Sequence, residues 1–183
     1  MTVPAELVAF WRAQGPAKWF SRHDTLDAEI ATLYGHTHLL ASRNELRDWE
    51  QTAEGTLALL LLLDQFPRNL YRGSAHSYAT DGLARAVARR ALEKGFDKKV
   101  DPILRPFFYL PFEHSESIGD QHLCIRLFEA HRDETGDEET LKWAVIHRDI
   151  IERFGRFPHR NEALGRDTTA EEQAYLDDDG FRG

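Results

Sequence analysis

A short, almost purely apolar segment in the first half of the chain sets the strongest limit on the fold. Residues 57–63 are an uninterrupted apolar run of seven within the segment 56–66. A helix that is apolar nearly all round its circumference is normally buried, so we predict that this segment forms the central helix of a core. A membrane-spanning helix needs about 20 apolar residues. The run is therefore typical of a globular protein without a membrane span.

Residue usage in the rest of the chain favours helices. Leu and Ala together number 42, whereas Val and Ile number 12, and β-branched side chains are the ones enriched in strands. Pro4 suits the first position of a helix, and Gly15 suits its end. We predict an all-α fold of about eight helices, joined by short turns into antiparallel pairs, in a single domain covering residues 1–183.

Proline and capping residues predict where several helices begin and end. Pro67 is expected to end the central helix, because proline disfavours helical geometry in the residue before it. The helix that Asp137 opens is expected to reach Phe157. Thr168 and Glu171 have the spacing of a capping box, which predicts a final short helix.

The formal net charge of −8 is concentrated in two places. The acidic clusters are Asp133, Glu134, Asp137, Glu138 and Glu139 around one turn, and Glu171, Glu172, Asp177, Asp178 and Asp179 in a tail that begins at about residue 171. We interpret them as a solvated turn and a solvated tail. The remaining side chains are slightly basic and rich in arginine. Binding to nucleic acid is not expected, because it depends on clustered Lys and Arg side chains.

The single cysteine, Cys124, cannot form an internal disulfide or a thiolate zinc cluster. One unpaired cysteine is typical of a reducing compartment, and the N-terminus lacks a basic start followed by an apolar core, so we expect a cytoplasmic protein. We predict neither a cofactor nor a metal ion. The weak candidate for a metal site combines His114, Glu116 and His122.

Three segments are polar where a simple connection between helices need not be: residues 64–69, 109–116 and 153–161. Planar guanidinium groups bind carboxylates and phosphates through two parallel hydrogen bonds. The sequence thus predicts a cleft for an anionic ligand. The candidate ligand-binding residues are Asp64, Gln65, Arg68, Asn69, Arg153, Arg156, His159, Arg160 and Asn161.

His114 and Glu116 are the candidates for acid–base chemistry. An imidazole titrates near neutral pH, and a neighbouring carboxylate can orient it. A structural alternative stays open, because buried charges are tolerated when they are paired. Asp64 would then neutralise Arg68. In the same way, Glu116 would neutralise Arg156.

Two of these segments contain similar residues in the same order. Residues 66–69 and 157–161 each place Phe and Pro, followed by Arg and Asn, after a strongly apolar helix. Two helix ends can explain both segments, because proline locks φ, and Arg and Asn can bond the last carbonyls of a helix. Further along the chain, His147 has the helical spacing from Trp143, Ile150 and Ile151 that is typical of a core histidine. Trp143 is expected in the core or at a joint between helices.

The three polar segments resemble the signatures of bacterial domain-of-unknown-function family 924, and the likeness extends along nearly the whole chain. The resemblance implies an all-helical fold similar to tetratricopeptide superhelices, although no 34-residue repeat consensus is present. It implies no established reaction. It does imply that the polar positions belong to the family pattern, which favours the ligand-site hypothesis.

Two hypotheses of different classes follow. In the first, an all-α protein binds a small anionic metabolite or an acidic peptide end in a cleft of arginine, histidine and carboxylate side chains. In the second, the chain is a tetratricopeptide-like scaffold for protein–protein interaction with no catalytic activity.

Overall fold

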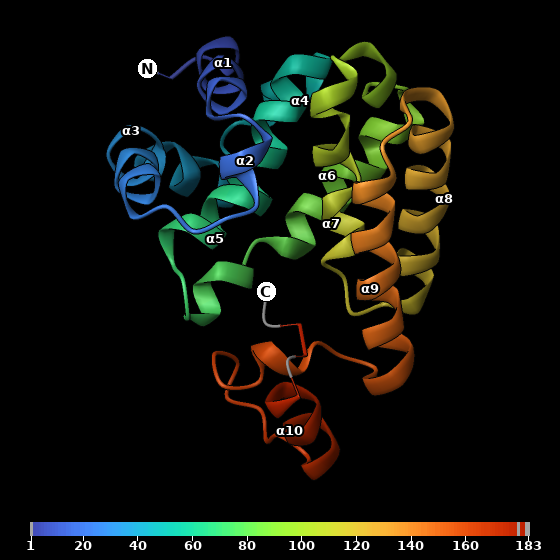
Figure 1. Cartoon of the computed structure of the whole chain (residues 1–183). Helices are drawn as coiled ribbons and strands as arrows, with labels where there is room; N and C mark the ends of the chain where they lie inside the picture. Colours follow the sequence, from blue (N-terminus) through green and yellow to red (C-terminus); the bar gives the residue numbers. More distant parts are fainter. Residues whose placement is uncertain (1, 179, 182–183) are drawn as a thin grey trace. The chain divides into compact units, whose positions relative to one another are not determined.

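The computed structural model describes residues 2–178, 180 and 181, and Asp179 of the acidic tail lies outside the described residues. The described part is helical and contains no strand, which confirms the all-α prediction (Figure 1). The chain divides into two compact units. The first contains the residues up to Arg72 together with His76–Pro111, and the second contains Gly73–Ala75 and the residues from Phe112 onward.

The first unit is built around the apolar segment. Its helical elements are α1 (Pro4–Gln14), α2 (Pro16–Trp19), α3 (Asp24–Ser42), η1 (Arg47–Gln51), α4 (Ala53–Leu60), η2 (Leu61–Gln65), α5 (Phe66–Leu70), η3 (Ala75–Tyr78), α6 (Asp81–Glu93), η4 (Asp97–Lys99) and η5 (Pro102–Phe108). Helix α4 contacts α1 on one side and α6 on another. The residues of α4 from Gly55 onward and all of η2 are buried, so the prediction of a central core helix is confirmed.

An aromatic cluster fills the space between α1 and the centre of the first unit. The ring of Trp11, which is fully buried, lies 5.5 Å from the ring of Phe66 and 5.8 Å from that of Phe107. Trp19 donates its indole N–H to the carbonyl of Trp11 at 2.7 Å. Buried aromatic pairs of this kind contribute about 0.5–1.5 kcal/mol beyond their burial.

The central helix does not end at Pro67, so that prediction is wrong. Residues 61–65 form a π-helical turn, and α5 continues through Pro67 to Leu70. The amide of Phe66 donates to the carbonyl of Leu61, five residues back. Side chains from elsewhere then satisfy two neighbouring carbonyls: His38 Nδ1 donates to Leu62 at 2.8 Å, and Thr80 Oγ1 donates to Leu63 at 2.6 Å. Proline is tolerated here because side chains supply the hydrogen bonds that its missing N–H cannot.

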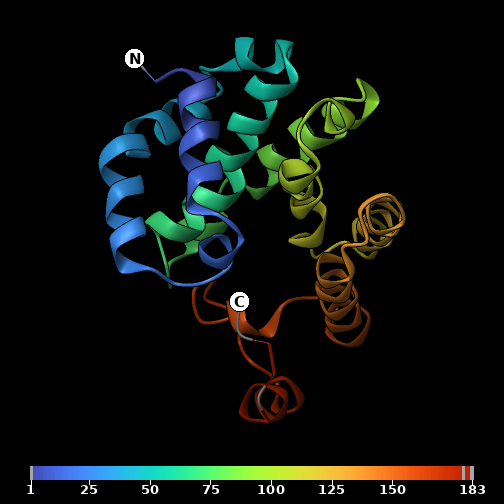
Figure 2. The same cartoon turned by 45° about the horizontal axis from the view of Figure 1, so that its top comes forward.

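The second unit contains a pair of long antiparallel helices. Its elements are α8 (Ile118–Thr135), α9 (Glu138–Phe154), η6 (Pro158–Arg160) and α10 (Ala170–Asp177), while α7 (Leu110–Glu113) contains the boundary between the units. Helices α8 and α9 lie side by side in both views (Figures 1 and 2). Gly136 joins them with a φ of 79°, and the carboxylate of Asp137 caps α9 by accepting from the amides of Glu139 and Thr140.

Two boundaries in the second unit differ from the predictions. Helix α9 ends at Phe154 rather than Phe157, because Gly155 adopts a φ of 69° that only glycine takes readily. The capping box lies one residue later than expected and joins Thr169 to Glu172. Because Glu172 is 3% exposed, the prediction of a solvated tail is wrong at this position.

Candidate functional site

The residues predicted for ligand binding and for acid–base chemistry fall in both units. Asp64, Gln65, Arg68 and Asn69 belong to the first unit, whereas His114, Glu116, Arg153, Arg156, His159, Arg160 and Asn161 belong to the second. The two groups are described separately.

In the first unit, internal carboxylates engage the guanidinium of Arg68. Its two terminal nitrogens donate to the two carboxylate oxygens of Asp81 at 3.0 and 3.1 Å. The carboxylate of Asp64, which is 1% exposed, lies 3.4 Å away. Burial would lower the pKa of Arg68, but these two carboxylates raise it above its ordinary value. The structural pairing of Asp64 with Arg68 is thus present.

The neighbouring amides also serve internal contacts. Asn69 Nδ2 donates to Asp27 at 2.8 Å, and Arg72 donates to both oxygens of the same carboxylate. Burial would raise the pKa of Asp27, but the hydrogen bonds from Arg72 and Asn69 hold it below its ordinary value. Gln65 Nε2 donates to the carboxylate of Asp64.

In the second unit, Glu116 pairs with an arginine that the sequence analysis did not single out. Its carboxylate accepts from Arg166 at 2.8 and 3.0 Å and from the amide of Phe157 at 2.9 Å. Burial would raise the pKa of Glu116, but these hydrogen bonds hold it below its ordinary value. Glu116 therefore stays ionised near neutral pH and fastens the segment after α9.

Arg156 pairs with Glu172 instead of Glu116. Its Nε and Nη2 donate to the two oxygens of this carboxylate at 2.6 and 2.8 Å. Asn161 Nδ2 and the amide of Thr169 donate to it as well, at 3.2 and 2.8 Å. The hydrogen bonds from Arg156, with help from Thr169, lower the pKa of Glu172 to about 2. Arg156 and Asn161 thus hold α10 in place within this unit.

Arg160 is buried, with 6% of its surface exposed. Its Nη1 donates to the carbonyl of His114 at 3.0 Å, and its guanidinium carbon lies 4.4 Å from the ring centre of Phe157. A cation above an aromatic face is stabilised by the ring quadrupole. The contacts of Arg160 therefore join η6 to the segment after α7.

The carboxylates that flank His114 in the sequence have other neighbours. Glu116 is bound to Arg166 as described above. Glu113 Oε1 lies 3.4 Å from Nδ1 of His147, and both side chains are buried. The same Nδ1 lies 2.8 Å from the carbonyl of Trp143. Glu113 thus forms a buried carboxylate–imidazole pair with His147, and the core position predicted for His147 is confirmed.

Arg153 differs from the other arginines of the predicted cleft. Its side chain is 52% exposed and pairs at 3.0 Å with Glu171, which is 64% exposed. Exposed ion pairs contribute only about 0–1 kcal/mol, because water and salt screen them. The guanidinium of Arg153 can thus exchange this partner for another anion at little cost.

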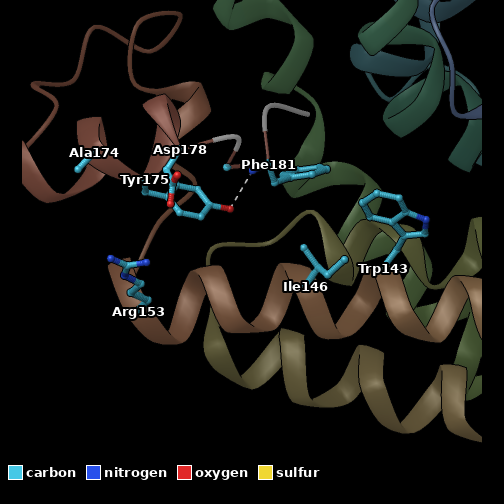
Figure 3. A pocket seen from close by; sticks show the side chains of 8 residues that line it. Trp143, Ile146, Arg153, Ala174, Tyr175, Asp178 and Phe181 are labelled. Carbon is cyan, nitrogen blue, oxygen red and sulfur yellow. Dashed lines mark hydrogen bonds between the residues drawn. The ribbon is translucent and has the colours of Figure 1, made fainter.

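Arg153 lies at the edge of a pocket of about 630 Å³ between α9 and the chain around α10 (Figure 3). The walls are mainly aromatic and aliphatic, and one acidic side chain takes part. The lining residues are Trp143, Ile146, Arg153, Ala174, Tyr175, Asp178, Gly180 and Phe181. Ligand sites typically have volumes of about 300–1,000 Å³ and apolar walls with a few polar groups.

Most residues of this pocket were not predicted from the sequence. Trp143, expected in the core or at a helix joint, is 41% exposed and so does not lie in the core, and Tyr175 and Phe181 lie within the acidic tail. The available signal was the presence of two aromatic residues in a segment otherwise rich in Asp and Glu. A second cavity, in the first unit, has a volume of only about 190 Å³ and is bordered by the ion pair between Arg90 and Glu50.

Among the described residues, no group of three His, Cys, Asp or Glu side chains is placed to hold a metal ion. His114, Glu116 and His122 therefore do not form the metal site that was considered from the sequence. His122 lies 3.6 Å from Glu152. Cys124 is fully buried, and burial raises the pKa of its thiol well above the ordinary value. None of the helices in the described part of the chain is long and apolar enough to cross a membrane.

The fold and the pocket define an all-α protein whose second unit, as far as it is described, contains a cavity of a size suited to small ligands. The chain belongs to the family described as bacterial proteins of unknown function, DUF924, whose model matches residues 7–180. It is similar to a solved structure of a protein of unknown function from Agrobacterium tumefaciens, with 47% identity, a TM-score of 0.90 and coverage of 96% of this chain and 97% of the other. No curated protein matches the chain.

Proposed function

We propose that the second unit binds a small molecule, or the end of a peptide, that carries both a flat apolar group and a carboxylate or phosphate. The observation that carries this proposal is the aromatic pocket with the exchangeable guanidinium of Arg153 at its edge. The predicted anionic ligand is retained, but its binding is assigned to one arginine of the predicted set.

The apolar walls would supply most of the affinity. Burial of apolar surface contributes about 25 cal/mol per Å², and the aromatic side chains of Trp143 and Tyr175 line the pocket. The anionic group of the ligand would replace Glu171 on Arg153. In this exchange the positive charge of Arg153 again faces an anion. The contact is directional, because a guanidinium donates two parallel hydrogen bonds to a carboxylate.

Four simple compounds test the proposal. Phenylacetate and phenyl phosphate combine a ring with an anion, benzyl alcohol has only the ring, and acetate has only the anion. We expect the first two to raise the melting temperature, since a ligand at a hundred times its Kd adds about 2.7 kcal/mol of stability. Benzyl alcohol should bind more weakly, and acetate should not bind measurably.

Variants of α9 provide the matched comparison. Arg153→Ala should reduce the affinity for phenylacetate at least tenfold in calorimetric titrations, while its affinity for benzyl alcohol stays unchanged. Arg148→Ala is the control, because Arg148 lies on the same helix and pairs with Asp149 and Glu152 outside the pocket. Equal binding of phenylacetate by the wild type and Arg153→Ala would refute the role of Arg153.

The alternative of a tetratricopeptide-like scaffold stays a hypothesis, and the antiparallel pair of α8 and α9 is the observation that favours it. A scaffold predicts no response to any of the four compounds. Cytoplasmic localisation remains an expectation from the single buried cysteine.

A further inference from the structure

The ring of Phe181 lies between two histidines and also lines the aromatic pocket. Its centre is 4.6 Å from the imidazole of His147 and 5.2 Å from that of His159, at interplanar angles of 64° and 85°. Figure 3 shows this ring beside the indole of Trp143, whose centre is 6.1 Å away. The chain thus places one of its own aromatic side chains against the wall of the pocket.

The walls around Phe181 are held by other contacts. His147 is fixed through Nδ1, which lies near the carbonyl of Trp143 and the carboxylate of Glu113. A carbonyl can only accept, so Nδ1 carries the hydrogen. Phe157 is fully buried and contacts both imidazoles, at 5.5 Å from His147 and 5.6 Å from His159. These walls therefore have supports that do not depend on Phe181.

The backbone amides of Gly180 and Phe181 are both hydrogen-bonded to Tyr175. The amide of Gly180 donates to the carbonyl of Tyr175 at 3.0 Å, and the amide of Phe181 donates to the hydroxyl of Tyr175 at 2.9 Å (Figure 3). A Cβ atom on Gly180 would lie 2.3 Å from that carbonyl oxygen. A side chain at position 180 would thus disturb this attachment, while the ring of Phe181 also packs against the core residues Ile150, Ile151 and Phe157.

We propose that the space taken by Phe181 is a binding site for the aromatic ring of a ligand, walled by His147 and His159, and that Phe181 acts as an internal competitor. A ligand ring that displaces Phe181 makes the same edge-to-face contacts with the imidazoles, while its anionic group reaches Arg153. The inference rests on the proposed function and specifies its ligand class as aromatic acids. It also adds a form of regulation, because release of the segment from Tyr175 opens the site.

Two variants remove the internal competitor in different ways. Phe181→Ala deletes the ring, and Gly180→Ala displaces the segment while it keeps the ring. Both should bind phenylacetate at least fivefold more tightly than the wild type. Gly119→Ala is the matched control, because a Cβ there meets only the hydroxyl of Ser117 at 3.7 Å, and it should bind like the wild type.

A measurement without the anionic ligand separates the two proposals. Modification by diethyl pyrocarbonate, followed residue by residue with mass spectrometry, should be at least threefold faster at His147 and His159 in both variants. His131, which is 2% exposed, should be unaffected. Toluene should slow the modification again in Phe181→Ala, because it restores a ring between the two imidazoles.

Each result has a definite meaning. Unchanged modification rates in both variants, or unchanged affinity for phenylacetate in Phe181→Ala when the wild type binds it, overturn the inference. If phenylacetate binds to none of the proteins, the proposed function fails. Protection of Phe181→Ala by toluene then still supports the ring site, and its absence overturns it.

Discussion

The two segments that carry Phe, Pro, Arg and Asn have similar residues and opposite effects on the backbone. In the first, Pro67 lies inside a helical run that passes through the π-helical turn of residues 61–65. In the second, α9 ends at Gly155, Phe157 is extended, and Pro158 opens the 3₁₀ helix η6. The residues before each proline make the difference. Proline fixes its own φ and lacks a donor, and both backbones satisfy these two conditions.

The polar residues of the two segments both form hydrogen bonds within their own unit. Arg68 and Asn69 bind the carboxylates of Asp81 and Asp27 within the first unit. Arg160 binds a backbone carbonyl, and Asn161 binds Glu172. The polar residues of both segments thus fasten neighbouring elements within each unit. The residue offered to a ligand, Arg153, precedes the second segment.

Removal of the carboxylate that holds Arg68 should have the largest effect. Asp81→Ala leaves a largely buried guanidinium with Asp64 as its remaining close carboxylate, and loss of one partner of a buried pair costs about 3 kcal/mol or more. Urea denaturation measures this loss. In the second segment the corresponding arginine, Arg160, donates to a backbone carbonyl, that of His114.

The control for Asp81→Ala is Asp24→Ala. Asp24 pairs with Arg22, and both side chains are more than 70% exposed. Its removal should change the unfolding free energy by less than about 0.5 kcal/mol. A loss below about 1 kcal/mol in Asp81→Ala would mean that the Arg68 pair is not what secures the first segment.

Much of the fold could be predicted because its signals are local. Pro4 and the glycine at position 15 bound α1, and Asp137 caps α9, as a few neighbouring residues indicate. The apolar run at 57–63 predicts its own burial in the same way. The continuation through Pro67 could not be predicted, since it depends on His38 and Thr80, which are distant in the sequence.

The candidate site was less predictable for a related reason. The sequence does not show which carboxylate an arginine will pair with. Arg166 lies 50 positions from Glu116, and Arg156 lies 16 positions from Glu172. Burial then decides which guanidinium groups are committed and which are exchangeable. The pocket itself has no motif, because its walls come from two helices and a tail that meet only in the fold.

Glu172→Gln should give the second largest effect and a change in pH dependence. The pKa of Glu172 is about 2 in the folded protein, below its ordinary value of about 4.5. A lowered folded pKa means that the stabilisation is complete above pH 4.5 and is lost as the pH falls toward 2. At pH 7 we expect a loss of about 2 kcal/mol, since hydrogen bonds to a charged group contribute about 1.5–3 kcal/mol.

Unfolding measured between pH 2 and 7 tests this prediction. The wild type should lose stability between pH 4.5 and 2, and Glu172→Gln should lack that part of the decline. Glu171→Gln is the control, because its exposed pair with Arg153 contributes little. Parallel curves for the wild type and Glu172→Gln would show that Glu172 does not anchor Asn161 and the second segment.

Thr80→Val should have the smallest effect and tests the feature that only the first segment has. Valine keeps the shape of threonine but removes the donor to the carbonyl of Leu63, which is buried in the π-helical turn. An unsatisfied buried carbonyl costs about 1–2 kcal/mol. Thr32→Val is the matched control, because Thr32 is exposed and donates to the carbonyl of Ala28 within α3, so it should change stability by a few tenths of a kcal/mol at most. Equal urea midpoints for the two variants would mean that the helix continues through Pro67 without the side-chain donor. The leucine run alone would then account for the different backbones of the two segments.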